Sequence, residues 1–104
     1  MARVWGYWAV FFLFTAPALA DPSPARQAEL RDMVSQDCGS CHGMTRKGGL
    51  GSPLLAEELA KFSLEAIVET ILEGRPGTPM PPWKTMLSRD DAEWIARYLM
   101  GEAQ

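Results

Sequence analysis

The 104-residue sequence predicts an all-α protein whose helices are joined by long irregular loops. Apolar residues recur at helical spacing in several segments, and serines and glycines stand where such helices would begin and end. No segment of useful length alternates apolar and polar residues as a half-buried strand would. Two loops rich in glycine or proline, residues 45–53 and 75–87, separate the helices. Long loops in a small domain usually need another group to order them.

The first helix is expected over residues 24–37. Ser23 is a favourable N-cap, and Pro24 suits the first helical position because its missing N–H is not needed there. The apolar stripe of this helix, at spacings of three and four, consists of Leu30, Met33 and Val34. A second, short turn or helix is expected around residues 54–61.

The third helix is expected over residues 64–73. Ser63 precedes it as a cap, and Gly74 follows it as a stop signal. Five apolar residues fall on one face of this segment, and we expect that face to be buried. They are Leu64, Ile67, Val68, Ile71 and Leu72.

The last helix is expected over residues 89–100. Ser88 caps it, and Asp91 follows three residues on, near a capping-box pattern. The residues expected to face inward are Ala92, Ile95, Ala96 and Leu99. Trp94 and Tyr98 lie four residues apart on this helix, and the simplest interpretation of that spacing is packing.

The first twenty residues are interpreted as a secretory signal peptide. Arg3 supplies a positive start, residues 4–15 are apolar and aromatic, and Ala18-Leu19-Ala20 forms a small-x-small cleavage signal. The alternative is a retained membrane anchor, but the apolar run is short for a span of about 20 residues, and Pro17 interrupts its end. We therefore expect a signal peptide over 1–20, one domain over 21–104 and a periplasmic location.

The expected mature domain is small and acidic. Without Arg3 it has nine basic against thirteen acidic residues, a net charge of −4. That balance argues against a nucleic-acid-binding protein. A domain of this size struggles to bury enough surface for stability and usually needs a disulfide, a metal or a cofactor.

The two cysteines of the chain lie in the sequence Cys38-Gly39-Ser40-Cys41-His42. The pattern C-x-x-C-H is typical of covalent c-type haem attachment. On an incipient helix this spacing brings both sulfurs to one haem edge, and the next residue directs its imidazole to the iron. A Cys38–Cys41 disulfide is an alternative. A thioredoxin-like pair would need a βαβ context, and a zinc site would need more ligands than one histidine.

A haem iron also takes a ligand on its other face, or leaves that position open. His42 is the only histidine, so a second histidine ligand is excluded, and methionine is the leading candidate. The candidates after the signal peptide are Met33, Met44, Met80, Met86 and Met100. Met80 is favoured because Pro79, Pro81 and Pro82 hold its backbone extended, so that the sulfur can be aimed at little entropic cost. Met86 is the weaker alternative.

Several segments together resemble a class I cytochrome c of the small bacterial type. They are CGSCH, GGLGSPLL at 48–55, GRPGTPMPPW at 74–83 and a final helix ending WIARYLMG, and the resemblance covers residues 30–101. The proline-rich loop is most similar to that of the small periplasmic cytochromes associated with cytochrome-cd-type nitrite reductase. The resemblance implies a small class I cytochrome c fold, with about four helices wrapped around one covalently bound haem c.

The same resemblance implies roles for individual residues. His42 would be the proximal iron ligand, Met80 the distal ligand, and Cys38 and Cys41 the thioether anchors. Pro53 would supply the carbonyl that accepts the ring N–H of His42, although the intervening Ser52 leaves the acceptor open by one residue. The first and last helices would cross near Met33, Val34, Ile95 and Tyr98.

Two further loop residues are candidates for contact with the cofactor. Trp83 would either donate its indole N–H to a haem propionate or serve as apolar cover. Arg75 would either pair with a propionate or remain a solvated surface charge. Four basic loop residues suggest a positive collar around the haem edge that steers an acidic partner, the alternative being ordinary solvated charge. They are Arg46, Lys47, Arg75 and Lys84.

The sequence thus predicts a monomeric one-electron carrier rather than an enzyme, because two axial ligands leave the iron no open site. Its partner would be a redox protein, such as a nitrite reductase or another respiratory cytochrome. A second hypothesis is an accessory role in the haem maturation of a nitrite reductase. A third is a ligand-binding or peroxidase haem protein in which Met80 dissociates.

Overall fold

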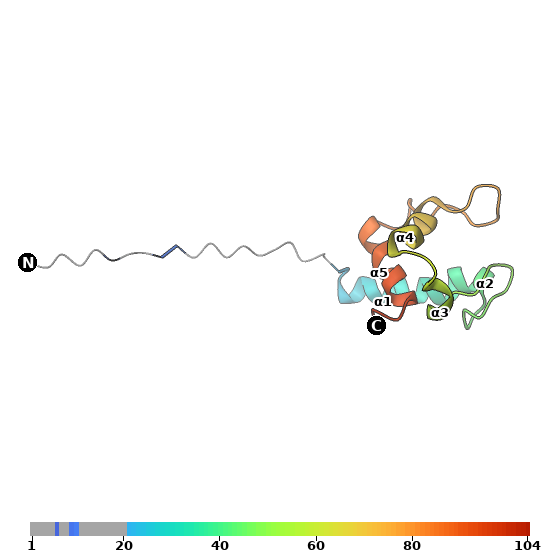
Figure 1. Cartoon of the computed structure of the whole chain (residues 1–104), viewed down its shortest axis with the longest axis horizontal. Coiled ribbons are helices and arrows are strands. Elements are labelled where there is room, and N and C mark those ends of the chain that lie inside the picture. Colours follow the sequence, from blue (N-terminus) through green and yellow to red (C-terminus); the bar gives the residue numbers. More distant parts are fainter. Residues whose placement is uncertain (1–5, 7–8, 11–20) are drawn as a thin grey trace, which may run out of the picture.

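The computed structural model of the chain describes residues 6, 9–10 and 21–104. In these residues the chain forms helices and loops without a strand, which confirms the all-α prediction. The helices are α1 (Pro24–Met33), η1 (Val34–Cys38), α2 (Gly39–His42), α3 (Ala56–Leu59), α4 (Leu64–Glu73) and α5 (Arg89–Leu99). The loops after α2 and after α4 both extend to the right in Figure 1. The expected signal peptide, residues 1–20, lies almost entirely outside the described residues.

Helices α1, η1 and α2 follow one another without a break, so the helical run is longer than the predicted 24–37. The middle piece, η1, is a five-residue π-helix, which the sequence pattern does not reveal. A π-helix closes its hydrogen bonds one residue further along than an α-helix and is frequent at functional sites. It therefore changes the direction in which α2, with Cys41 and His42, faces relative to α1.

The predicted helix caps are present. The side-chain oxygen of Ser23 accepts the N–H of Arg26 at 3.2 Å, and that of Ser63 accepts the N–H of Ala66 at 3.1 Å. Ser88 and Asp91 form a complete capping box, in which each side chain accepts the other's backbone N–H. Each cap satisfies N–H groups that the first turn of a helix leaves unpaired.

The hydrophobic core lies where α5 packs against α4 and α1. The largest fully buried side chains are Leu30, Val34, Val68 and Ile95. Burying a side chain of this size stabilises a fold by about 1.5–3 kcal/mol. The faces predicted to be apolar are thus the ones that hold the helices together, although Leu64 and Ile71 are only partly buried. No helix in the described part of the chain is long and apolar enough for a membrane span.

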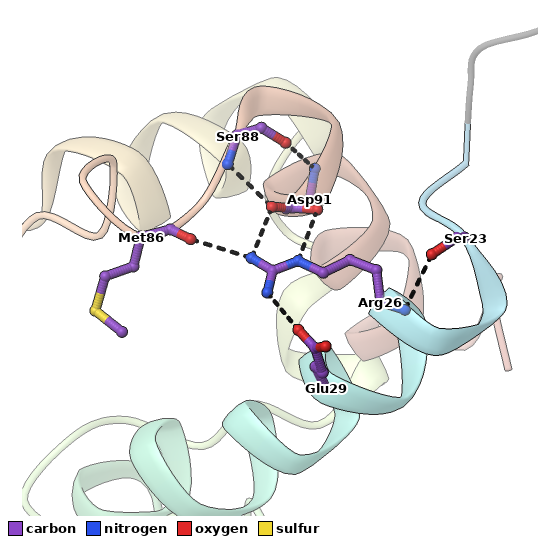
Figure 2. Close-up of polar contacts among 6 residues, drawn as sticks. All are labelled: Ser23, Arg26, Glu29, Met86, Ser88 and Asp91. Carbon is purple, nitrogen blue, oxygen red and sulfur yellow. Dashed lines mark hydrogen bonds and ion pairs between the residues drawn. The ribbon is translucent and has the colours of Figure 1, made fainter.

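A polar network ties α1 to the start of α5 (Figure 2). The guanidinium of Arg26 donates to both carboxylate oxygens of Asp91, at 3.4 and 3.0 Å, and to Glu29 at 2.8 Å. It also donates to the carbonyl of Met86 at 3.1 Å, in the loop before α5. Burial by itself would raise the pKa of Asp91, but the hydrogen bonds from Arg26 and from the Ser88 N–H outweigh it and hold that pKa below its usual value. One arginine therefore joins α1 to the start of α5 and to the loop just before it, which lie 60 to 65 residues further along the chain.

An aromatic stack lies further along α5. The rings of Trp94 and Tyr98 are parallel within 9° and 5.2 Å apart, which agrees with the packing expected from their spacing. The guanidinium of Arg31 lies 5.8 Å from the Trp94 ring centre, and that of Arg46 lies 5.4 Å from the Tyr98 ring centre. The stack thus connects α1, α5 and the glycine-rich loop after α2.

Candidate haem-binding cavity

A cavity of about 580 Å³ opens between α2, α4, α5 and the two long loops. It is lined by every residue that the sequence singles out for cofactor binding. They are Cys38, Cys41, His42, Pro53, Arg75, Met80 and Trp83. These residues are spread over much of the domain, so the fold brings together side chains that are distant in the chain. A volume of this order is typical of cofactor and ligand sites.

The walls of the cavity are largely apolar. Helices and loops contribute Met33, Leu54, Leu59, Phe62, Ile67, Ile71, Leu87, Ile95 and Leu99. Several of these residues also belong to the hydrophobic core, so the cavity is continuous with the core of the domain. The sequence pattern did not assign Leu59 and Phe62 to a site. They are placed there by α3 and the turn after it, which bring apolar side chains under the cavity from a loop-rich segment.

His42 ends α2, and a hydrogen bond holds its ring. Its Nδ1 lies 2.7 Å from the carbonyl oxygen of Ser52. A carbonyl can only accept, so Nδ1 is the donor of this bond, and in a neutral ring Nε2 then keeps the lone pair that a metal ligand requires. The expectation that Pro53 supplies this carbonyl is wrong by one residue. Ser52 extends the loop by one position before the proline, so Ser52 presents its carbonyl to the ring and Pro53 lines the cavity.

A glycine makes room for this ring. A Cβ atom at Gly51 would lie 2.7 Å from both Cε1 and Nδ1 of His42, which is closer than real Cβ contacts. Any side chain at this position would therefore turn the ring or move the loop. The orientation of the His42 ring therefore depends on Gly51 as well as on Ser52.

The two cysteines are free thiols, so the alternative of a Cys38–Cys41 disulfide is not formed in the structure. Cys38 closes η1 and is half-buried, whereas Cys41 on α2 is exposed. Burial raises the pKa of the Cys38 thiol, and the neighbouring carboxylate of Asp37 adds to the effect. Both residues line the cavity that His42 faces, as thioether attachment to one bound group requires.

The loop that carries Met80 is anchored to the end of α4. The N–H groups of Trp83 and Lys84 donate to the carbonyls of Ile71 and Leu72, at 3.1 and 3.2 Å. The Arg75 N–H donates to the Met80 carbonyl at 3.2 Å and closes the loop on itself. Met80 is thereby held at the cavity by backbone hydrogen bonds as well as by its flanking prolines.

The other methionines differ from Met80 in their surroundings. Met44 and Met86 are 70% and 56% exposed and do not line the cavity. Met100 is partly buried and packs against the core. Met33 lines the cavity but also packs against the core, whereas Met80 lines it without belonging to the core cluster. Packing therefore accounts for Met33 and leaves Met80 as the sulfur whose placement it does not explain.

The basic collar expected from the sequence does not form as a unit. Lys84 is paired with Glu73 at 3.0 Å, and Arg46 lies over the Tyr98 ring. Of the four basic loop residues, Arg75 alone lines the cavity. The other charged residues of the lining are Asp37, Glu58 and Lys61, with Lys61 paired to Glu58. Charged residues of both signs therefore line this site.

The residues present fit a covalently held haem. Both cysteines, His42 and Met80 line one largely apolar cavity, and the space beside the imidazole is kept by a glycine. Imidazole and thioether are both common axial ligands of haem iron.

The family model described as cytochrome C oxidase, cbb3-type, subunit III matches residues 25–99 of the chain. The chain belongs to this family of c-type cytochromes. Membership explains the cavity, since this cytochrome binds haem c covalently, and the chain has one C-x-x-C-H motif. It also confirms the resemblance that the sequence motifs indicated.

This cytochrome is similar to other c-type cytochromes and to a segment of one larger enzyme. It is 54% identical over 79 residues to cytochrome c55X of Paracoccus denitrificans, covering 76% of this chain and 77% of the relative. It resembles the solved c-type cytochrome NirC with a TM-score of 0.76 and 51% identity, covering 77% of this chain and 94% of that one. It is also 36% identical over 75 residues to the dihydro-heme d1 dehydrogenase of Pseudomonas aeruginosa, which spans 72% of this chain but 15% of that enzyme.

Proposed function

We propose that this cytochrome is a periplasmic one-electron carrier whose haem iron is held by His42 and Met80. The observation that carries the proposal is the cavity, whose lining includes His42, Met80 on a restrained backbone, and both cysteines. The bound haem c supplies one-electron redox chemistry. Imidazole with thioether ligation raises the reduction potential, and two protein ligands leave no open site for a substrate, so the protein is a carrier rather than an enzyme.

The chain's own residues tune this centre in three ways. The Ser52 carbonyl orients the His42 ring and makes it more basic. The apolar wall excludes water. Arg75 faces the cavity without an ion-pair partner in the described part of the chain, which supports pairing with a haem propionate. Trp83 packs against the core, which favours apolar cover as its role.

The cytochrome is proposed to act as a monomer over residues 21–104, after export by the signal peptide of residues 1–20. Its partner is proposed to be another redox protein, such as a nitrite reductase or a respiratory cytochrome. Support comes from the relatives, among them the cytochrome named NirC. The test is reduction of a purified cytochrome-cd-type nitrite reductase by the reduced protein under stopped flow. No electron transfer above that of free reductant would contradict it.

The ligand assignment is tested by optical spectroscopy of the oxidised holoprotein. Sulfur bound to iron gives a charge-transfer band in the far red, and Met80→Ala is expected to abolish it. Met86→Ala is the matched control, because Met86 is exposed and outside the cavity. A far-red band that persists in Met80→Ala would refute the assignment. Rapid CO binding by the reduced wild-type protein would favour a ligand-binding function instead.

A second candidate function is favoured by one comparison. The similarity to a segment of dihydro-heme d1 dehydrogenase suggests that this cytochrome accepts electrons during maturation of the reductase's haem. The two functions differ in the direction of electron transfer. In the first the cytochrome gives electrons to the reductase, and in the second it accepts electrons during haem maturation. If maturation is the role, a strain lacking this protein should make nitrite reductase deficient in its mature haem. If electron delivery is the role, the reductase should be fully loaded but slowly reduced.

A further inference from the structure

Gly74 lies directly behind the segment that carries Met80. It follows the last residue of α4, is buried, and has φ +67° and ψ −165°, a conformation that is nearly exclusive to glycine. Its N–H donates to the Thr70 carbonyl at 2.9 Å, so it is fixed to the end of the helix. The helix in turn is fixed to α5 through the buried core.

The space that a side chain at Gly74 would need is filled by backbone. A Cβ atom there would lie 2.6 Å from the carbonyl carbon of Pro81, and 2.7 Å from both the Met80 oxygen and the Pro82 nitrogen. Ordinary contact begins at 3.4 Å, so the backbone would have to retreat by most of an ångström. Flexible side chains could rotate away at little cost, but these are main-chain atoms of a proline-flanked segment.

The segment that carries Met80 would move, rather than the end of α4. The end of α4 is held by buried Val68 and Leu72, whereas Pro81 and Pro82 are exposed on their outer side. The Met80 carbonyl oxygen, one of the colliding atoms, also accepts the Arg75 N–H, so this loop-closing hydrogen bond would be disturbed as well. Met80 would move with its own carbonyl.

We propose that Gly74 is a positioning residue for Met80, whose absent side chain allows the segment to lie close enough to α4 for the sulfur to reach the iron. This inference rests on the proposed role of Met80 as an axial ligand. A misplacement of about 1 Å can cost an aligned group on the order of 100-fold in its reaction. We therefore expect Gly74→Ala to shift the balance between methionine-ligated and methionine-free protein by about tenfold or more.

Gly77 provides the control, because it lies in the same loop with φ +79° but has nothing within 4 Å of its missing Cβ. Oxidised holoproteins of wild type, Gly74→Ala and Gly77→Ala are compared by far-red absorption, reduction potential and far-ultraviolet circular dichroism. Gly74→Ala is expected to lose the far-red band and to fall in potential with its helix signal intact. Gly77→Ala is expected to keep the band. Retention of the band in Gly74→Ala would overturn the inference.

A double variant separates positioning from a merely structural effect. In a Met80→Ala background there is no sulfur to position, so adding Gly74→Ala should leave the potential and the rate of CO binding by the reduced protein unchanged. If Gly74→Ala prevents folding in both backgrounds, the inference is overturned, because Gly74 then serves the fold as a whole. A far-red band that survives Met80→Ala would instead refute the proposed ligand, whatever Gly74 does.

Discussion

Arg26 is expected to contribute more to stability than the other surface arginines, because its main partner is nearly buried. Asp91 is 8% exposed, and Arg26 joins it to Glu29 and to the Met86 carbonyl (Figure 2). The proposed change is Arg26→Met, which keeps much of the side-chain length and removes the charge and the donors.

The size of the effect follows from the contacts that are lost. A hydrogen bond to a charged group contributes about 1.5–3 kcal/mol, and an exposed ion pair such as that with Glu29 about 0–1 kcal/mol. Asp91 still accepts the Ser88 N–H at 3.1 Å after the change, so its charge is not left without a partner. We therefore expect Arg26→Met to lower the free energy of unfolding by about 2 kcal/mol, or the melting temperature by roughly 8–16 °C.

The assay is guanidinium unfolding of the oxidised holoprotein at neutral pH, followed by far-ultraviolet circular dichroism. Arg89→Met is the matched control. Arg89 contacts three carboxylates, those of Glu65, Glu69 and Glu93, but the first two are at least half exposed. If burial rather than the number of ion pairs sets the contribution, Arg26→Met should be the more destabilised variant. A loss in Arg26→Met equal to or below that in Arg89→Met would refute the reasoning.

Two further predictions concern Asp91 and the histidine loop. The pKa of Asp91 is lowered in the fold, so its ionised form stabilises the protein above the ordinary aspartate pKa of about 3.9, and this contribution is lost as the pH falls through the lower folded value. Denaturant titrations should therefore show Asp91→Asn less stable than wild type by a constant amount from pH 7 to 5, with the difference shrinking below pH of about 4; a gap that widens in acid would contradict this. Gly51→Ala should turn the His42 ring, because its Cβ would lie 2.7 Å from that ring, and lower haem retention or iron-ligand affinity by about 10–100-fold. Ser52→Ala keeps the accepting carbonyl and should leave both haem content and reduction potential unchanged; equal loss in the two variants would show that the Gly51 contact is not the cause.

Local sequence patterns predicted most of the helices. Ser23, Ser63 and Ser88 are the caps found in the structure, because a cap is a contact between residues three apart and needs no distant partner. The π-helix η1 was missed because an α-helix and a π-helix of five residues share the same apolar pattern. The weakly patterned α3 was expected only as a turn or helix, and its part in the cavity depends on what it packs against.

The features of the site also divide into those that local sequence predicted and those that depend on distant contacts. The spacing of Cys38, Cys41 and His42 indicated haem attachment, since the C-x-x-C-H pattern needs only residues about one helical turn apart. The acceptor for the His42 ring was expected one residue too late, because the path of a glycine-rich loop follows from contacts with distant parts of the chain. The expected basic collar does not form as a unit, because two of its members contact other residues. Lys84 pairs with Glu73, and Arg46 stacks on Tyr98.

The sequence by itself determined the helical class, the caps, the covalent attachment motif and Met80 as the favoured second ligand. Each of these rests on the chemistry of residues close together in the chain. The tertiary structure alone decided that Ser52 holds the histidine ring, that Arg26 joins α1 to the start of α5, and that Gly74 lies against the backbone of Met80 to Pro82. These are contacts through space between segments whose separation in the sequence carries no signal of their meeting, and packing is what brings them together.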